Sequence, residues 1–132
     1  MREILFRGKN YKGEWLYGSL QQWYDTFGGD IKSQIHPVEL EPTQQGGRVD
    51  STTIGQFTGL VDRNGKRVFE GDIIHVDNYD DGWNSMVEFK GGAFAVDVEG
   101  KEYDYTAIGW LEYEVEIIGN IHDNPELVEE VK

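Results

Sequence analysis

The sequence predicts a mainly β fold, an antiparallel meander that forms a small barrel or a sandwich. Short β-prone segments recur along the chain between turn residues, and the 132 residues include 17 glycines. Such glycines supply the tight turns that many short strands require. Regularly spaced short strands with glycine turns are typical of all-β barrels and sandwiches. By analogy, an SH3-like barrel is one version of this prediction.

The strongest local signal covers residues 53–76 and predicts a hairpin followed by a third strand. Asp62–Lys66 forms the hairpin turn, because Asn64-Gly65 tolerates positive φ and the Asp62 side chain can cap the turn. The chain then returns over Lys66–Phe69, turns again at Gly71 and enters a strand over Ile73–Val76.

The N-terminal part predicts one hairpin and an irregular segment. Residues 3–20 read as two strands around a glycine-marked turn, with Trp15 and Tyr17 on one face of the second strand. In the irregular segment, residues 21–50, we expect these local structures: a helical turn at Gln21–Tyr24, strands at Ile31–Ile35 and Val38–Leu40, and a mobile loop at Gln44–Gly47.

The C-terminal part continues the meander. The expected elements are a strand at Met86–Phe89, a turn at Gly91-Gly92, strands at Ala93–Val98, Tyr103–Tyr105 and Trp110–Gly119, and a helical turn or frayed tail at Asn124–Val131. The length is that of one domain. We divide it into an N-terminal hairpin with its irregular segment (1–50), a barrel or sandwich core (51–124) and a tail (125–132).

Composition excludes several classes of site. The chain has no Cys, which rules out disulfides, thiolate catalysis and zinc–thiolate sites. No apolar run approaches the ~20 residues of a membrane span, and the N-terminus does not resemble a signal peptide. We expect a soluble, intracellular protein with no membrane partner.

The net charge of −13, from 25 acidic and 12 basic residues, argues against nucleic acid as a partner because it repels phosphate backbones. Arg63, Lys66 and Arg67 lie close together at the hairpin turn, but three charges are a small footprint. Solubility is the simplest reason for the acidity.

One acidic segment resembles a calcium-binding loop. Asp77, Asp81, Gly82 and Glu88 occupy positions one, five, six and twelve of an EF-hand loop. Tyr79 does not suit position three, and the flanking segments read as strands rather than helices. An acidic hairpin loop is therefore the preferred interpretation, with calcium at Asp77, Asp81 and Glu88 as the alternative. We predict no other metal site and no cofactor.

No catalytic residue is predicted. His36, His75 and His122 are far apart in the sequence and sit in no metal or catalytic motif. The alternation of Glu112, Glu114 and Glu116 is typical of a solvated strand face or of a charged edge that resists aggregation.

The aromatic residues raise the hypothesis of a stacking platform for single strands. They are Trp15, Tyr17, Trp83, Tyr103, Tyr105, Trp110 and Tyr113. Such platforms carry a basic groove, whereas this chain is acidic, so core and interface positions are the preferred interpretation.

Four segments together resemble the YopX family of phage and prophage proteins. They are Arg7 with Trp15–Ser19, Thr53–Leu60, Asp62–Ile73 and Glu114–Leu127. Ile54 and Phe57 depart conservatively from the Val and Tyr of the family pattern. The resemblance implies a β-rich, oligomeric protein in the cytoplasm of a bacterial host, and it supplies no catalytic residues.

Three functions follow as hypotheses. The first is a non-enzymatic phage accessory protein that works through protein–protein contacts, as a homo-oligomer or with a host or phage protein. The second is an acidic DNA mimic that inhibits a host nucleic-acid enzyme. The third is a metal-dependent or enzymatic module, which the missing motifs disfavour.

Overall fold

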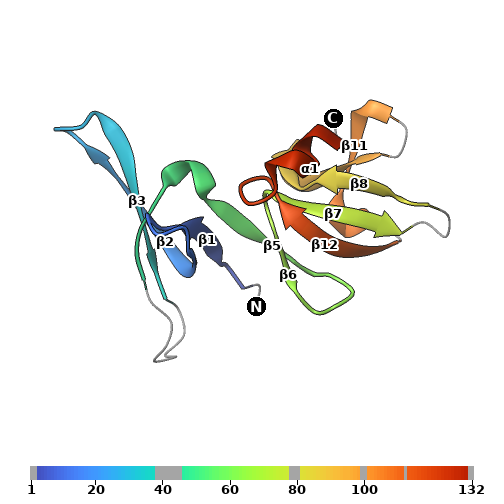
Figure 1. The fold of residues 1–132 in the computed structure, drawn as a ribbon, viewed down its shortest axis with the longest axis horizontal. Coiled ribbons are helices and arrows are strands. Elements are labelled where there is room, and N and C mark those ends of the chain that lie inside the picture. The colour runs from blue at the N-terminus through green and yellow to red at the C-terminus, as the bar shows by residue number, and fades with distance from the viewer. Residues whose placement is uncertain (1–2, 38–45, 78–80, 99–100, 112, 131–132) are drawn as a thin grey trace. The chain divides into compact units, whose positions relative to one another are not determined.

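The structure, a computed structural model, describes residues 3–37, 46–77, 81–98, 101–111 and 113–130. The chain forms two compact units, residues 1–57 (unit 1) and 58–132 (unit 2), shown in Figure 1. The division falls inside strand β5 (Gly55–Val61), whereas the sequence suggested a subdivision after Asp50.

A six-stranded sheet has the order β4-β3-β2-β1-β5-β6, and unit 1 contains its strands from β4 to the start of β5, which pair antiparallel. Its elements are β1 (Phe6–Lys9), β2 (Trp15–Asp25), β3 (Asp30–His36), β4 (Gly47–Val49), the 3₁₀ turn η1 (Ser51–Thr53) and the first residues of β5. The predicted first hairpin and the strand at Ile31–Ile35 are confirmed. The segments predicted at Val38–Leu40 and Gln44–Gln45 lie outside the described residues, and Gly47 opens β4.

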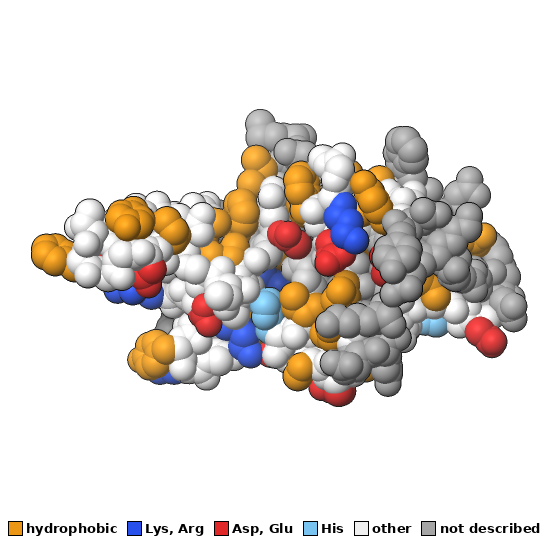
Figure 2. Space-filling model, turned by 90° about the horizontal axis from the view of Figure 1, so that it is seen from above, with side chains coloured by type: hydrophobic (Ala, Val, Ile, Leu, Met, Phe, Trp, Pro, Cys, Tyr) orange, Lys and Arg blue, Asp and Glu red, His pale blue; other side chains and the backbone are white. Residues whose placement is uncertain are grey.

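The prediction of a helical turn at Gln21–Tyr24 is wrong, because these residues belong to the long β2–β3 hairpin. These residues pair with β3, in a register that runs from Ser19 opposite His36 to Asp25 opposite Asp30. Oδ1 of Asp25 accepts the N–H groups of Phe27 and Gly28, at 2.9 and 3.2 Å, and these bonds lower the pKa of Asp25. Figure 2 shows hydrophobic side chains exposed at this end of the unit.

The core of unit 1 lies on one face of its sheet. Leu16, Ile35 and Val49 are buried there, and Phe6, Leu20 and Ile54 pack against them. Gly8 permits this packing, because a Cβ atom at that position would lie 2.8 Å from a methyl carbon of Val49.

Unit 2 contains two three-stranded sheets with the orders β12-β7-β8 and β11-β10-β9. Its elements are the end of β5, β6 (Arg67–Phe69), β7 (Asp72–Asp77), β8 (Trp83–Met86), β9 (Glu88–Lys90), β10 (Ala93–Val98), β11 (Lys101–Ala107), η2 (Ile108–Trp110), β12 (Glu114–Asn120) and α1 (Pro125–Glu130). The helical turn predicted near Pro125 is confirmed. In the part of the chain that the structure describes, no helix is long and apolar enough to cross a membrane.

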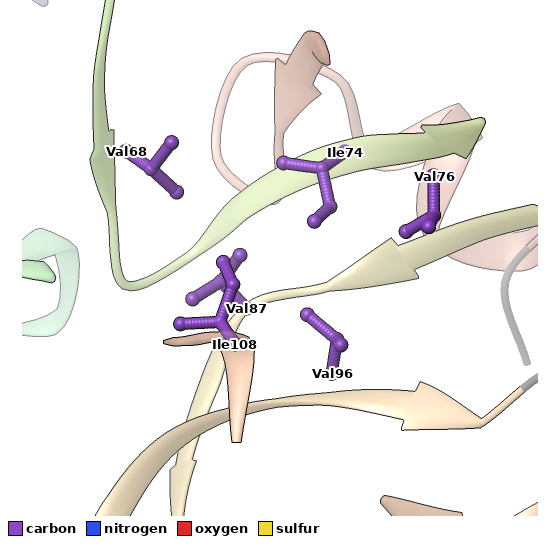
Figure 3. Packing of buried hydrophobic residues seen from close by; sticks show 6 residues of the cluster. All are labelled: Val68, Ile74, Val76, Val87, Val96 and Ile108. Atoms are coloured by element: carbon purple, nitrogen blue, oxygen red, sulfur yellow. The ribbon is translucent and has the colours of Figure 1, made fainter. Parts of the chain in front are cut away.

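The two sheets enclose one hydrophobic cluster. Its members point toward one another in Figure 3 and are Val68, Ile74, Val76, Val87, Val96 and Ile108, each at most 6% exposed. This confirms the mainly β fold and its sandwich version. No barrel closes within the described ranges, so the SH3-like version is not the one adopted.

The chain changes sheets at Val87, so the single strand predicted at Met86–Phe89 is wrong. Strand β8 ends at Met86 in one sheet, and β9 begins at Glu88 in the other. The N–H of Val87 donates to the carbonyl of Asp72, and its carbonyl accepts the N–H of Gly71, both at 2.9 Å. The main chain is thus hydrogen-bonded at the corner, as a strand passing between two packed sheets requires.

The last strand is shorter than predicted. The alternation over Trp110–Gly119 suggests one strand, but η2 occupies its start and β12 begins at Glu114. The register between β12 and β7 shifts between Ile117 and Gly119, which leaves Ile118 as a bulge with 38% of its surface exposed.

Asp62 caps the β5–β6 turn as predicted. Oδ1 accepts the N–H groups of Asn64 and Lys66 at 2.9 Å, and Oδ2 accepts the N–H of Ile117 in β12 at 3.1 Å. Burial acts to raise the pKa of this carboxyl group, but the three N–H donors outweigh burial and hold the pKa below its ordinary value.

Replacing Asp62 with Ala should lower the free energy of unfolding by about 2–4 kcal/mol, because three N–H groups lose their acceptor. Urea denaturation at pH 7 measures this, with the exposed Asp30→Ala as a control that should change it by less than about 1 kcal/mol.

The effect should also depend on pH. A depressed native pKa stabilises the fold fully above the unfolded pKa of about 3.9, and this stabilisation is lost as the pH falls through the native value. The difference between wild type and Asp62→Ala should therefore shrink below about pH 4. A difference that stays constant down to pH 2 would contradict the role of the ionised carboxylate.

Candidate functional site

The two units carry very different charges. Residues 1–57 hold six basic and seven acidic residues, a net charge of −1. Residues 58–132 hold six basic and eighteen acidic residues, a net charge of −12. The acidity of the whole chain is therefore almost entirely a property of unit 2.

The structure does not bring the calcium candidates together. Asp77 ends β7, and its Oδ2 accepts a hydrogen bond from Nη2 of Arg63 at 3.0 Å. Glu88 lies in the other sheet, 2.9 Å from Nζ of Lys90, and this contact raises the pKa of Lys90. Asp81 is exposed just before β8. The described residues contain no group of three His, Asp or Glu side chains placed to hold a metal.

The positive charge of Arg63 offsets part of the negative charge of the alternating glutamates. Besides Asp77, its Nη2 lies 3.6 Å from Oε2 of Glu114, which β12 places directly opposite Asp77. The hydrogen bond to Asp77 raises the pKa of Arg63. Asn64 of the same turn donates to Glu116 at 3.4 Å. Glu114 and Glu116 therefore belong to a polar network around the hairpin turn, and Glu112 lies outside the described residues.

The three histidines lie on separate elements. Nε2 of His36 is 2.8 Å from Oε1 of Gln21 across β2 and β3. Nδ1 of His75 is 2.8 Å from Oδ1 of Asn84 across β7 and β8. His122 follows the end of β12. The hydrogen bonds of His36 and His75 are thus with neutral amide side chains.

The predicted aromatic residues divide between the units. Trp15 and Tyr17 lie in unit 1. In unit 2, Trp83 packs against the core, donates to the carbonyl of Asp97 at 3.0 Å and meets Tyr113 edge-on, with ring centroids 6.2 Å apart. Tyr105 lies beside Lys90, while the side chains of Tyr103 and Trp110 are outside the described set. Trp83 thus has a core role.

Sequence reasoning missed the apolar tip of the β2–β3 hairpin. Phe27 in the turn is 100% exposed, and Tyr24 and Ile31, which pair across the strands, are 61% and 49% exposed. These three residues form what we call the hairpin tip. The turn signal at Gly28-Gly29, with aromatic and apolar residues spaced evenly around it, could have revealed it.

Calcium at millimolar concentration should leave the melting temperature of the protein unchanged, because Asp77 and Glu88 lie in different sheets and each contacts a cationic side chain. Differential scanning calorimetry with calcium and with a chelator measures this. Magnesium is the control for general ionic effects. A calcium-specific rise that Asp81→Ala abolishes would contradict the prediction.

Comparison with known proteins identifies the relationship. The family model described as YopX protein matches residues 5–129. A curated relative, the SPbeta prophage-derived uncharacterized protein YopX of Bacillus subtilis strain 168, is 40% identical over 73 residues. That match covers 52% of this chain and 54% of the relative, so it spans about half of the relative's length.

Two solved structures share the fold. The crystal structure of YopX from Bacillus subtilis superposes with a TM-score of 0.59 at 28% identity, covering 100% of both chains. The structure of protein EF1440 from Enterococcus faecalis gives 0.56 at 25% identity, covering 97% of this chain and 99% of the other. Since the family model spans both units, the chain belongs to the YopX protein family.

Proposed function

We propose that this chain is a non-enzymatic phage accessory protein that acts through protein–protein contacts as a homo-oligomer, with the hairpin tip as the contact. The observation that carries this proposal is the exposure of Phe27, Tyr24 and Ile31 at the end of a two-stranded ribbon. The setting is supported by the SPbeta prophage origin of the Bacillus subtilis relative.

The hairpin tip has the chemistry of a contact surface. Aromatic residues are enriched in protein interfaces, where burying one Phe side chain yields about 1.5–3 kcal/mol. Phe27 gives unit 1 no such stabilisation by burial, since its side chain is fully exposed. A partner that covers the tip would remove this apolar surface from water.

Charge favours a second copy of the chain as that partner. Unit 1 has a net charge of −1, so like-charge repulsion does not oppose contact between two copies of it, whereas contact between two copies of unit 2 would join charges of −12. A two-fold pairing places the same patch on both sides, and an apolar tip is complementary to itself.

Phe27→Asp should weaken self-association at least about tenfold, because it puts a carboxylate in the centre of the contact. Sedimentation velocity over a concentration series measures the dissociation constant. The matched control is Tyr11→Asp, since Tyr11 is 91% exposed at the β1–β2 turn of unit 1. A monomeric wild type, or equal losses in both variants, would contradict the proposal.

A second candidate function is DNA mimicry by unit 2. The observation that favours it is the concentration of eighteen acidic residues and a net charge of −12 in residues 58–132. A protein surface of that charge attracts the basic grooves of nucleic-acid enzymes. The carboxylates of Asp77 and Glu114 are less available for this role, because they contact Arg63.

If unit 2 is a mimic, the tagged protein should capture a basic nucleic-acid enzyme from nuclease-treated bacterial lysate, and high salt should release it. Mass spectrometry identifies the partner. Charge reversal at exposed Asp81 and Glu126, as Asp81→Lys with Glu126→Lys, should weaken capture, while Phe27→Asp should not. A partner retained in high salt would instead indicate an apolar contact.

A further inference from the structure

One face of the unit 1 sheet carries cations and aromatic rings. Directly paired residues share a face, and alternate residues along a strand return to it. The register pairs Lys9 with Trp15, Trp23 with Lys32 and Gln34 with Arg48. The face therefore holds, strand by strand, Lys9, Trp15, Tyr17, Trp23, Lys32, Gln34, His36 and Arg48, with the buried Arg7 beside Tyr17.

The cations and rings on this face are in contact. Nζ of Lys9 lies 5.5 Å from the ring centre of Trp15, and the guanidinium of Arg48 lies 5.4 Å from that of Trp23. At the β1–β2 turn, Nζ of Lys12 lies 5.9 Å from the ring centre of Tyr11. Both tryptophans are half-buried, and the guanidinium of the buried Arg7 also lies 4.6 Å from the ring centre of Trp15.

A hollow of about 630 Å³ lies at the end of the sheet where these groups meet. Lys9, Tyr11 and Arg48 contribute to its lining. Among the described lining residues the carboxylate is that of Asp50, which accepts hydrogen bonds from the N–H and the hydroxyl of Thr52, at 3.0 and 2.8 Å. The hollow is of the size of a small-molecule site, and its described charged lining residues are the half-buried Lys9 and the exposed Arg48 and Asp50.

We propose that this face and its hollow bind single-stranded nucleic acid. Phosphates would contact Lys9, Lys12 and Arg48, and unpaired bases would stack on the exposed Tyr11 and beside the half-buried Trp15 and Trp23. A duplex is a poorer ligand for two reasons. Its stacked bases cannot stack on protein rings, and three cations are too few to bind a duplex strongly. Trp15 and Trp23 are eight residues apart, or about 27 Å along an extended strand, enough for a few nucleotides.

The net charge of the chain does not oppose this site. Unit 1, which contains the site, has a net charge of −1, and the acidity of the chain is concentrated in residues 58–132. The carboxylates on this face, Asp25 and Asp30, lie at the turn end of the hairpin, where Asp30 is 3.4 Å from Nζ of Lys32.

The site is separate from the hairpin tip. Tyr24 and Ile31 alternate with Trp23 and Lys32 along the two strands, so they point to the opposite side of the sheet. The inference goes beyond the proposed contact function, and the two can fail independently.

Fluorescence anisotropy with a labelled oligothymidylate of about twelve nucleotides tests the proposal. The wild type should bind, and Arg48→Ala should weaken binding at least fivefold and reduce the slope of log K against log salt by about 0.7. Arg48→Lys should retain most of the affinity. Tyr11→Ala should weaken binding about tenfold, whereas Tyr11→Phe keeps the ring and should not.

The controls separate this site from the other surfaces. Lys66→Ala removes a cation of the unit 2 turn, and Phe27→Asp disrupts the hairpin tip, so neither should change oligonucleotide binding. Arg48 and Tyr11 are exposed, so their variants should melt like the wild type. No anisotropy change in 50 mM salt, equal losses for Lys66→Ala and Arg48→Ala, or equal affinity for a duplex would overturn the proposal. Salt-sensitive self-association without oligonucleotide binding would overturn it too, and would assign the face to the acidic unit of a second copy.

Discussion

Unit 2 depends on the hydrogen bonds that surround Gly71 and Asp72. The N–H of Gly71 donates to Val87 and its carbonyl accepts the N–H of Ile121, while the carbonyl of Asp72 accepts the N–H of Val87. The Asp72 carboxylate, itself buried, accepts the N–H of Phe69 at 2.7 Å. These bonds connect the end of β6, the start of β7, the corner between the two sheets and the end of β12. Gly71 suits this place because its φ is +91°.

The elements that local chemistry determines could be predicted from the sequence. Asn64-Gly65 and the Asp62 carboxylate specify the β5–β6 turn through neighbouring backbone groups, and the prediction held in detail. The errors arose where the local structure is determined by hydrogen bonds to residues distant in the sequence. Gln21–Tyr24 is a strand because β3 lies beside it, and Val87 is a corner because Gly71 and Asp72 bond to it. No periodicity in a short window contains that information.

The candidate sites follow the same pattern. Asp77 and Glu88 have the spacing of a calcium loop, but the corner at Val87 places Glu88 in the other sheet. The net charge of −13 argues against nucleic acid only as an average over the chain, because residues 1–57 have a net charge of only −1. The cationic face of unit 1 becomes visible only when the strand register pairs Trp23 with Lys32 and Gln34 with Arg48, residues far apart in the sequence.

The turn at Asp25–Gly29 determines which residues share a face of the hairpin. Because side chains alternate along a strand, a slip of one residue between β2 and β3 would break the pairing of Trp23 with Lys32 and of Tyr24 with Ile31. Lys32 would then oppose Tyr24, and each face would mix charge with apolar surface. The Asp25 carboxylate, by holding the N–H groups of Phe27 and Gly28, opposes that slip. The residues on each surface of unit 1 are thus determined by the length of this one short turn as well as by the surface residues themselves.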